Sequence, residues 1–458
     1  MISSSRITLS SLHESDITEE YLETLNDRDY LRYSRNSSFD HTVESQTRYI
    51  SEFNLSYNLL FGIKSNTDMN LLGSVSCYID FTKLTLNLGF LIFKNYQGKG
   101  IASEALGLLL RHLEGQFPGM TAIIGSESNN LAMHEVAKKH DFKILNEDSE
   151  DVHVIFVRTL RRLDATSLPR IPSYVLCARS IGVVAYDAGG AEQISWLLRN
   201  IPQKVVAYIE GPAVRIFDNL EVAFDKADEL SDIFECDLVI TGSGWMSQLE
   251  ITAIQQAKLR NIPCLTVLDH WMNYPERFGT DDKSQPNTFA VTNPIALQLA
   301  QEKFPSSVIY LLPDFQIESY RIALAARKQE PKQGLILLDP ISTLVPNFTI
   351  DRNKIIKLIE SAIRIKQHQG LTSLILRPHP SQITDPLLTH ILDIFSEEVV
   401  LSNNPSLLKD LAVSKMVIGL NSYALYISSQ CEITTYSYFA GEIGHWSNFF
   451  SNILEIEF

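Results

Sequence analysis

The stretch Leu-Gly-Phe-Leu-Ile-Phe-Lys-Asn-Tyr-Gln-Gly-Lys-Gly-Ile-Ala, at residues 88–102, decides the fold of the first part of the chain. Its first residues are mostly apolar and predict a strand, and residues 101–116 place apolar side chains at helical spacing. The glycines between strand and helix let the main chain approach a bound group closely. Because the first N–H groups of a helix have no partner within the helix, a turn of this kind can hold an anion.

The residues around this turn predict a mixed α+β domain that spans residues 1–162. Alternating apolar residues indicate strands, and apolar residues three or four positions apart indicate helices. The predicted strands lie at 7–12, 59–63, 71–81, 84–93, 120–124 and 152–160, and the predicted helices at 16–25, 43–53, 101–116 and 130–140.

A second motif, Asn-Asn-Leu-Ala-Met-His-Glu-Val-Ala-Lys-Lys-His-Asp-Phe, follows at residues 129–142. The first stretch resembles the GNAT acetyltransferase motif of Gln or Arg, two residues, Gly, one residue, and Gly or Ala, which Gln97, Gly100 and Ala102 match. The second motif is similar to its counterpart in the branch that contains ribosomal-protein alanine acetyltransferases. The resemblance implies a GNAT fold with acetyl-CoA as cofactor. It implies that Asn130 contacts the pantetheine arm and that the turn binds the pyrophosphate through the main chain of Gln97, Gly98, Lys99, Gly100, Ile101 and Ala102.

Acetyl transfer to an amine needs a route for the amine proton and a proton donor for the departing thiolate. GNAT proteins often place a Glu on the fourth strand, where this chain has Asn87, and a Ser or Tyr in the second motif, where it has Met133 and Ala137. Glu127 is the candidate catalytic carboxylate, and a solvated loop carboxylate is the alternative interpretation. We expect His134 to be a surface residue of its helix. The domain either acetylates an amine through proximity and a water chain, or binds acetyl-CoA without turnover.

The second part of the chain has a different pattern. Residues 163–180 contain Pro169 and Pro172 without clear periodicity, which is typical of a linker. Beyond it, short Val, Ile and Leu runs alternate with helical stretches and predict parallel sheets covered on both faces. We therefore expect two Rossmann-like subdomains, at residues 181–330 and 331–458. Their predicted strands lie at 181–186, 205–209, 238–241, 264–268, 289–292, 334–338, 373–376, 399–401, 416–418 and 433–436.

Ligands of parallel α/β sheets bind beyond the carboxyl ends of the strands, so the residues that follow each predicted strand are candidates for a site. The segment Arg377-Pro378-His379-Pro380 looks like one in GT-B glycosyltransferases of bacterial surface-polysaccharide pathways. This resemblance implies a nucleotide-sugar donor whose leaving phosphate His379 assists by donating a hydrogen bond or a positive charge. The residues expected to bind the donor are Gly189, Gly190, Arg377, His379, Asn421 and Ser422.

The base that activates the acceptor has two candidates. Asp187 follows the first predicted strand of this part and is preferred, because a base in the first subdomain would face a donor in the second. Asp269 and His270 form an alternative acid and base pair beside Trp271 and Tyr274.

Composition limits the class of protein further. No stretch of 18 or more apolar residues occurs and the start lacks the features of a signal peptide, so we expect a cytoplasmic protein without a membrane span. A net charge of −15 argues against nucleic-acid binding. The five cysteines lack a metal-ligand spacing, so we expect reduced thiols and no metal site.

These observations predict a bifunctional enzyme of bacterial glycan biosynthesis. One domain would acetylate a small amine or an amino sugar, and the other would transfer a sugar from a nucleotide sugar to a glycan or protein acceptor. Two alternatives stay open. The second part is a nucleotide-sugar hydrolase or epimerase, or it is a large partner-binding domain attached to a protein N-acetyltransferase.

Overall fold

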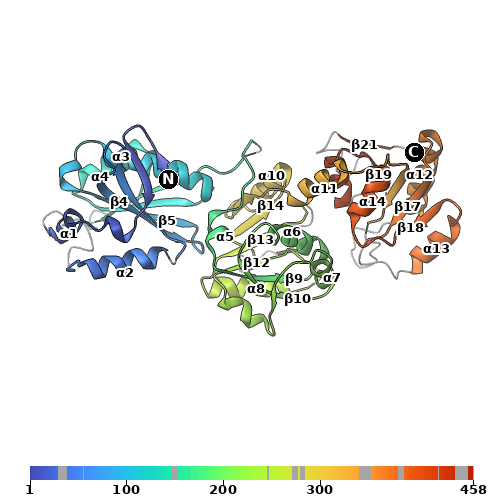
Figure 1. Cartoon of the computed structure of the whole chain (residues 1–458), viewed down its shortest axis with the longest axis horizontal. Helices are drawn as coiled ribbons and strands as arrows, with labels where there is room; N and C mark the ends of the chain where they lie inside the picture. Colours follow the sequence, from blue (N-terminus) through green and yellow to red (C-terminus); the bar gives the residue numbers. More distant parts are fainter. Residues whose placement is uncertain are drawn as a thin grey trace.

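The computed structural model describes residues 1–28, 39–54, 56–146, 153–164, 166–244, 247–270, 277–278, 284–339, 352–379, 386–420, 422–438 and 452–456. Three sheets, each flanked by helices, follow one another along the chain, and Figure 1 shows them side by side in a row. Among the described residues, every helix is too short or too polar to cross a membrane.

The first sheet has eight strands in the order β1-β2-β3-β4-β5-β6-β8-β7. Every neighbouring pair is antiparallel except β5 with β6, which run parallel. Helices α1 and α2 share one apolar core with one face of the sheet, and α3 shares another with the opposite face. The elements are β1 (Ile2–Ser3), β2 (Ile7–Ser11), α1 (Glu19–Asn26), α2 (Val43–Asn54), β3 (Leu59–Ser65), β4 (Leu71–Asp80), β5 (Thr85–Ile92), α3 (Ile101–Gln116), β6 (Thr121–Glu127), α4 (Leu131–Lys139), β7 (Lys143–Asn146) and β8 (His153–Thr159).

The second sheet has seven strands in the order β11-β10-β9-β12-β13-β14-β15, and all of them run parallel. Its central strands β9 and β12 are buried at every residue except Ser180, which explains their continuous Val, Ile and Leu runs. The elements are α5 (Ser173–Cys177), β9 (Ser180–Ala185), α6 (Ala188–Leu198), β10 (Lys204–Ile209), α7 (Pro212–Asn219), β11 (Asp225–Lys226), β12 (Leu238–Thr241), α8 (Leu249–Leu259), β13 (Cys264–Val267), β14 (Thr288–Val291), α10 (Pro294–Lys303), β15 (Val308–Leu311) and α11 (Phe315–Ala325).

The third sheet has six parallel strands in the order β18-β17-β16-β19-β20-β21. In both parallel sheets the chain fills one side, returns to the first strand and then fills the other side, as doubly wound sheets do. The elements are β16 (Gln333–Leu337), α12 (Arg352–Gln369), β17 (Ser373–Arg377), α13 (Pro386–Ile394), β18 (Val399–Leu401), α14 (Leu407–Val413), β19 (Ser414–Gly419), α15 (Tyr423–Gln430), β20 (Thr434–Ser437) and β21 (Ile453–Glu455).

The segment predicted as a linker, residues 163–180, contains the short helix α5. Its Tyr174 and Val175 are buried in the same core as residues of the first two sheets. The apolar side chains of this segment therefore hold it against the domains, which its proline content alone did not indicate.

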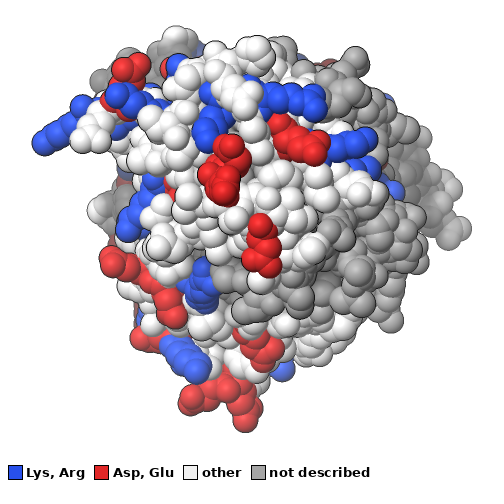
Figure 2. All heavy atoms as spheres, turned by 90° about the vertical axis from the view of Figure 1, so that its right-hand side faces the viewer, with Lys and Arg blue, Asp and Glu red and all other residues white. Residues whose placement is uncertain are grey.

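Charged side chains are mixed on the surface that belongs to the third sheet. Figure 2 shows Lys and Arg interspersed with Asp and Glu over the part of this face that the structure describes. An alternation of both signs does not form the basic surface that nucleic-acid binding requires.

Candidate functional site

The glycine turn between β5 and α3 leaves its main-chain N–H groups available. Gly98 and Gly100 have φ angles of 68° and 77°, in the left-handed region that favours glycine. Both are exposed, and Gly100 caps the start of α3. Within the described residues, the N–H groups of Gly98 through Ala102 donate no hydrogen bond. The turn therefore presents several donors, together with the positive end of the helix dipole, to an anion in solvent.

Next to this turn, β5 and β6 separate. They pair only over Thr85–Asn87 and Thr121–Ile123, although β5 continues to Ile92 and β6 to Glu127. The other edge of each strand stays paired, with β4 and β8 respectively. The two facing edges beyond Asn87 and Ile123 thus carry unpaired peptide groups, to which an extended ligand with amide groups can hydrogen-bond.

One face of the separated strands carries the predicted catalytic carboxylate. Asn87 lies opposite Tyr78 of β4 and Ile123 of β6, so these three share a face. Glu127 is four residues after Ile123 and therefore lies on the same face, half-buried. Its neighbour on β8 is His153, which is exposed. Sequence reasoning missed His153, because only strand register brings it beside Glu127.

Asn130 and His134 fix the start of α4. Asn130 caps the helix, and its Oδ1 accepts a hydrogen bond from the N–H of Met133 at 3.3 Å. The Nε2 of His134 donates to the main-chain oxygen of Glu127 at 2.9 Å. His134 is half-buried and its ring lies 5.0 Å from that of Phe156, so it holds α4 against the end of β6 and is more enclosed than we predicted.

A basic depression of about 370 Å³ adjoins the turn. Residues on one side of α3 meet the end of α4 there, and the Oγ of Ser103 lies 3.0 Å from the Nε2 of His140. Arg6 supports the turn by donating to the main-chain oxygen of Lys99 at 3.2 Å. The lining residues are Arg6, Gly100, Ser103, Glu104, Gly107, Arg111, Lys139 and His140.

Glu104 moderates the positive charge of this depression. Its carboxylate accepts hydrogen bonds from Ser4 at 2.5 Å and from the Nε of Arg6 at 2.7 Å. Burial opposes ionisation, but these hydrogen bonds and the charge of Arg6 hold the pKa of Glu104 below its ordinary value. Arg111 and Lys139 are exposed, and their charges can attract a phosphate group.

A glycine turn at a helix start, beside a separated parallel strand pair, defines a domain suited to a long phosphorylated cofactor. Residues 6–143 match the family model described as the acetyltransferase (GNAT) domain. The N-terminal part of the chain is a GNAT acetyltransferase domain, as the two motifs predicted.

Several solved structures are similar to about a third of the chain. The microcin C7 self-immunity acetyltransferase MccE, in complex with acetyl-CoA and AMP, is 19% identical, with 34% of this chain and 93% of that chain covered and a TM-score of 0.30. A GNAT-family acetyltransferase from Bacillus anthracis is 17% identical, with 34% and 97% covered and a TM-score of 0.31. Spermidine N-acetyltransferase from Vibrio cholerae, in complex with CoA and spermine, is 14% identical, with 34% and 97% covered and a TM-score of 0.32. No curated protein matches the chain.

In the second sheet, the turn after β9 is closely packed. A Cβ atom added to Gly190 would lie 3.1 Å from the Cα of Gly242, so this glycine permits a close approach of two backbones. A Cβ added to Gly189 would lie 2.1 Å from the Oδ2 of Asp269. A carboxylate therefore sits beside the turn. That Gly189 and Gly190 bind a donor phosphate stays a prediction.

Asp187 and Glu250 face each other at the carboxyl end of this sheet. A Cβ added to Gly244 would lie 2.9 Å from the Asp187 Oδ2 and 2.9 Å from the Glu250 Oε1, so the absence of a side chain makes room for both. The Glu250 Oε1 accepts a hydrogen bond from the N–H of Tyr186 at 2.8 Å. Burial, with a smaller contribution from the charge of Asp187, raises the pKa of Glu250 to about 7.

The alternative pair, Asp269 and His270, lies at the same edge. Arg277 donates to Asp269 at 2.5 Å and to the Oγ of Ser243 at 2.7 Å. Although burial opposes ionisation, the charge of Arg277 holds the pKa of Asp269 below its ordinary value. Burial, helped by Arg277, lowers the pKa of His270 to about 4, so its ring is neutral at pH 7. Trp271 and Tyr274 lie outside the described residues.

The third sheet supplies the other predicted donor residues. The Nη1 of Arg377 donates to the fully buried Asp410 at 2.7 Å and to the main-chain oxygen of Asn404 at 3.0 Å, so its visible contacts are structural. Burial lowers the pKa of His379 to about 4. This histidine is therefore neutral at pH 7, which favours the first of its two predicted roles, donation of a hydrogen bond, over donation of a positive charge. Ser422 caps α15, its Oγ accepting from the N–H of Ala424 at 3.3 Å, and Asn421 lies outside the described residues.

The two parallel sheets approach each other through His270 and Tyr423. Their ring centroids are 6.2 Å apart, although Tyr423 begins α15 of the third sheet and His270 follows β13 of the second. The hydroxyl of Tyr423 also lies 3.4 Å from the Oγ1 of Thr292, which follows β14. The carboxyl end of the second sheet thus contacts the start of α15.

Proposed function

We propose that the chain is a bifunctional enzyme whose GNAT domain transfers an acetyl group from acetyl-CoA to the amine of a small molecule or amino sugar. The observation that carries this proposal is the turn at residues 98–102, whose N–H groups donate no hydrogen bond within the described residues, directly beside the separated edges of β5 and β6. The turn would hold the pyrophosphate, the strand edges would hold the amide-containing arm, and Arg111 and Lys139 would attract a further phosphate group.

The acceptor amine would approach on the sheet face that carries Asn87 and Glu127. Acetyl-CoA supplies an activated thioester, whose carbonyl carbon forms a bond with the amine nitrogen while the carbon–sulfur bond breaks. Glu127, through a water molecule and with His153 beside it, would take the proton from the amine. Asn87 cannot act as a base, because its amide does not accept a proton at neutral pH. It can orient the amine by hydrogen bonding.

This proposal is tested by titrating acetyl-CoA into the purified protein in a calorimeter and by following CoA thiol release with a panel of amines. The panel contains free and nucleotide-linked amino sugars, a polyamine and a short peptide. Absence of acetyl-CoA affinity would overturn the proposal. Affinity without thiol release would leave a cofactor-binding domain, and acetylation of the peptide alone, identified by mass spectrometry, would favour a protein N-acetyltransferase.

For the second and third sheets we propose a GT-B-like pair that acts on a nucleotide sugar. Supporting observations are the two doubly wound strand orders and the polar residues at the carboxyl end of the second sheet, which contacts α15. Asp187 would act as base, with Glu250 beside it, and His379 and Ser422 would contact the donor.

Incubation with CMP-, UDP-, GDP- and CDP-sugars and measurement of nucleotide release tests this second activity. No release from any donor would contradict it. Free sugar in the absence of an acceptor would favour a hydrolase, and conversion to an isomeric nucleotide sugar would favour an epimerase.

A further inference from the structure

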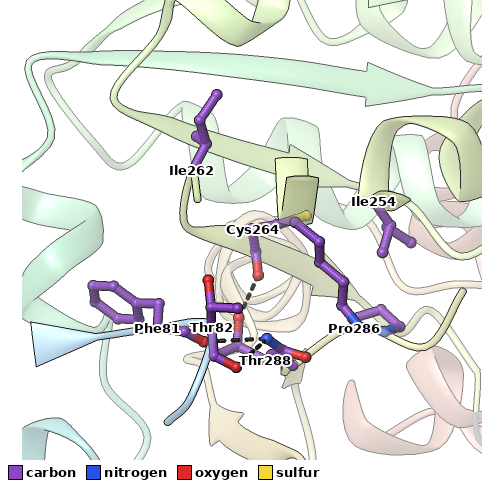
Figure 3. Close-up of a pocket in the computed structure, with 9 residues that line it drawn as sticks. Phe81, Thr82, Ile254, Ile262, Cys264, Pro286 and Thr288 are labelled. Atoms are coloured by element: carbon purple, nitrogen blue, oxygen red, sulfur yellow. Dashed lines mark hydrogen bonds between the residues drawn. The ribbon is translucent and has the colours of Figure 1, made fainter. Parts of the chain in front are cut away.

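The hairpin between β4 and β5 is bound to the second sheet. The side-chain amide of Asn287 donates to the main-chain oxygens of Phe81 and Thr82 at 3.2 and 3.0 Å. The Oγ1 of Thr82 donates to Asn261 at 3.2 Å. Asn287 precedes β14 and Asn261 precedes β13, so the hairpin lies on the amino-terminal edge of the parallel sheet (Figure 3).

Aromatic side chains continue this contact through the interior. The ring of Phe81 lies 4.7 Å from that of Tyr174 in α5 and 6.3 Å from that of Phe117, the residue that ends α3. Tyr174 in turn lies 5.6 Å from Tyr310 of β15. Phe117, Tyr174 and Tyr310 are each no more than 2% exposed. One buried aromatic cluster therefore passes from the GNAT helix α3 through α5 into the second sheet.

We call this contact between the GNAT domain and the second sheet the seam. Polar contacts lie at its edge. The hydroxyl of Tyr57 donates to the main-chain oxygen of Asp237 at 2.5 Å. The Asp237 carboxylate accepts two hydrogen bonds from the Arg179 guanidinium, at 3.0 and 2.8 Å, and one from the Arg179 main-chain N–H at 2.9 Å, which hold its pKa below the ordinary value. The cavity drawn in Figure 3, between Phe81, Thr82 and the second sheet, measures only about 10 Å³. It has room for about one water molecule, so the hairpin packs closely on the second sheet at this point.

We propose that the GNAT domain and the second sheet unfold as one cooperative unit, so that acetyl-CoA bound at the start of α3 stabilises both. The helix links the two events physically, since its first residues form the cofactor turn and Phe117 at its end packs in the seam. A ligand that binds only the folded state stabilises every part that unfolds together with its site.

The same geometry separates the two sites. From the seam, β5 runs toward the cofactor turn, whereas the strands of the second sheet run toward Asp187 and His270. At about 3.3 Å per residue, the eight residues of β5 span about 26 Å and the six of β9 about 20 Å, leading away from the seam. Both proposed sites therefore lie away from the seam, and the fusion would act as shared structural support.

Hydrogen exchange of the full chain, read by mass spectrometry with and without acetyl-CoA, tests the proposal. At an acetyl-CoA concentration about 100 times its Kd, the slowest amides of β9 and β12 should exchange about 100-fold more slowly than without acetyl-CoA. Those of β5 and α3 should slow by the same factor. Slowing that is confined to residues 1–160 would overturn the proposal.

Two phenylalanines of the first sheet provide matched variants. Phe81→Ala removes the ring at the centre of the seam. In this variant acetyl-CoA should no longer slow amide exchange in β9 and β12, but it should still slow exchange in β5. Phe61 is also half-buried but packs on His112 within the GNAT domain, with ring centroids 5.9 Å apart. In Phe61→Ala, acetyl-CoA should still slow amide exchange in both the GNAT domain and the second sheet. Equal behaviour of the two variants would contradict the proposed seam.

Failure of the proposed function can be distinguished from failure of this inference. If the protein does not bind acetyl-CoA, the ligand-free Phe61→Ala variant still reports coupling, because it should speed exchange in β9 and β12 as well as in β5. Faster exchange in the GNAT domain alone would refute coupling. If Phe81→Ala does not fold, Asn287→Ala takes its place. This variant lacks two hydrogen bonds to the hairpin, so acetyl-CoA should slow amide exchange in β9 and β12 less than in the parent.

Discussion

Glu127 and His153 are neighbours on adjacent strands at the open end of β6, on the face where Asn87 replaces the expected carboxylate. We predict that Glu127→Gln lowers kcat for acetyl transfer by about 100-fold, the usual size of a general-base contribution. Affinity for acetyl-CoA should stay unchanged, because the turn at 97–102 is intact. Steady-state CoA release measures the first quantity and calorimetry the second.

Glu135 provides the control for this substitution. It is an exposed carboxylate on α4 that pairs with Lys138 at 3.8 Å. Glu135→Gln should leave kcat within two-fold or so of the original. A Glu127→Gln enzyme with full activity would exclude Glu127 from proton transfer and would direct attention to His153.

The raised pKa of Glu250 makes stability depend on pH. A carboxyl group whose pKa is about 7 when folded and about 4.5 when unfolded binds its proton more tightly in the folded state. Its stabilising contribution is therefore present at acidic pH and is lost as the pH rises through 7. In the parent, this group should lower the free energy of unfolding by roughly 2 to 3 kcal/mol between pH 5 and 8, and we predict that Glu250→Gln removes this decline.

Urea unfolding at several pH values measures this decline. His270 and His379, whose pKa values are lowered to about 4, have the opposite sign: they reduce stability as the pH falls from 6.5 toward 4. Both the parent and the variant contain these histidines, so the difference between the two curves isolates Glu250. The exposed Glu235 in the same domain serves as control, and Glu235→Gln should not alter the pH dependence.

At the level of the elements, α3 and the end of α4 together form the basic depression beside the turn. We predict that Arg111→Ala and Lys139→Ala each weaken acetyl-CoA binding about three-fold, ~0.6 kcal/mol, as expected for a solvated ion pair. Added salt should reduce the difference between variant and parent, since it screens these charges. Titration calorimetry at two salt concentrations measures both effects.

Lys138 is the matched control for this pair of variants, because it lies on α4 outside the depression and pairs with Glu135. Lys138→Ala should bind acetyl-CoA like the parent. A loss of affinity equal to that of Lys139→Ala would mean that only the net charge of α4 matters.

The sequence was informative where the chemistry is local. The turn at 97–102 is formed by consecutive residues, so its glycines and the following helix could be recognised from their order alone. The separation of β5 from β6 and the pairing of His153 with Glu127 depend on strand register, which local patterns do not contain. Arg377 was predicted to bind a donor. Its partner Asp410 lies 33 residues further along the chain, and no local signal marks that distant pairing.

At the scale of the whole molecule, the composition of residues 163–180 predicts a linker, and within it Tyr174 joins two domains. Prolines and polar residues describe the local backbone preference of this segment. They do not reveal that Tyr57 and Phe81, far away in sequence, pack on Tyr174, or that Phe81 also packs on Phe117. The packed seam therefore appears only when the domains are seen together.

A GNAT fragment of residues 1–162 should consequently be less stable than a fragment of residues 1–330. Removal of α5 and the second sheet takes away Tyr174 and Tyr310 and exposes the apolar side chains that packed on them. Such a patch promotes self-association. We predict a lower Tm for residues 1–162, measured by circular dichroism, and concentration-dependent elution in size-exclusion chromatography.

Phe81→Ser should then have different effects in the two settings. In the short fragment, Phe81 loses Tyr174 but keeps Tyr57 and Phe117, so the substitution should reduce association and lower Tm only slightly. In residues 1–330 the same substitution places a hydroxyl in a buried aromatic cluster and should lower Tm, because the lost packing and the unsatisfied polar group both destabilise the folded state. A monomeric short fragment with the Tm of residues 1–330 would show that the seam contributes little to the stability of the GNAT domain.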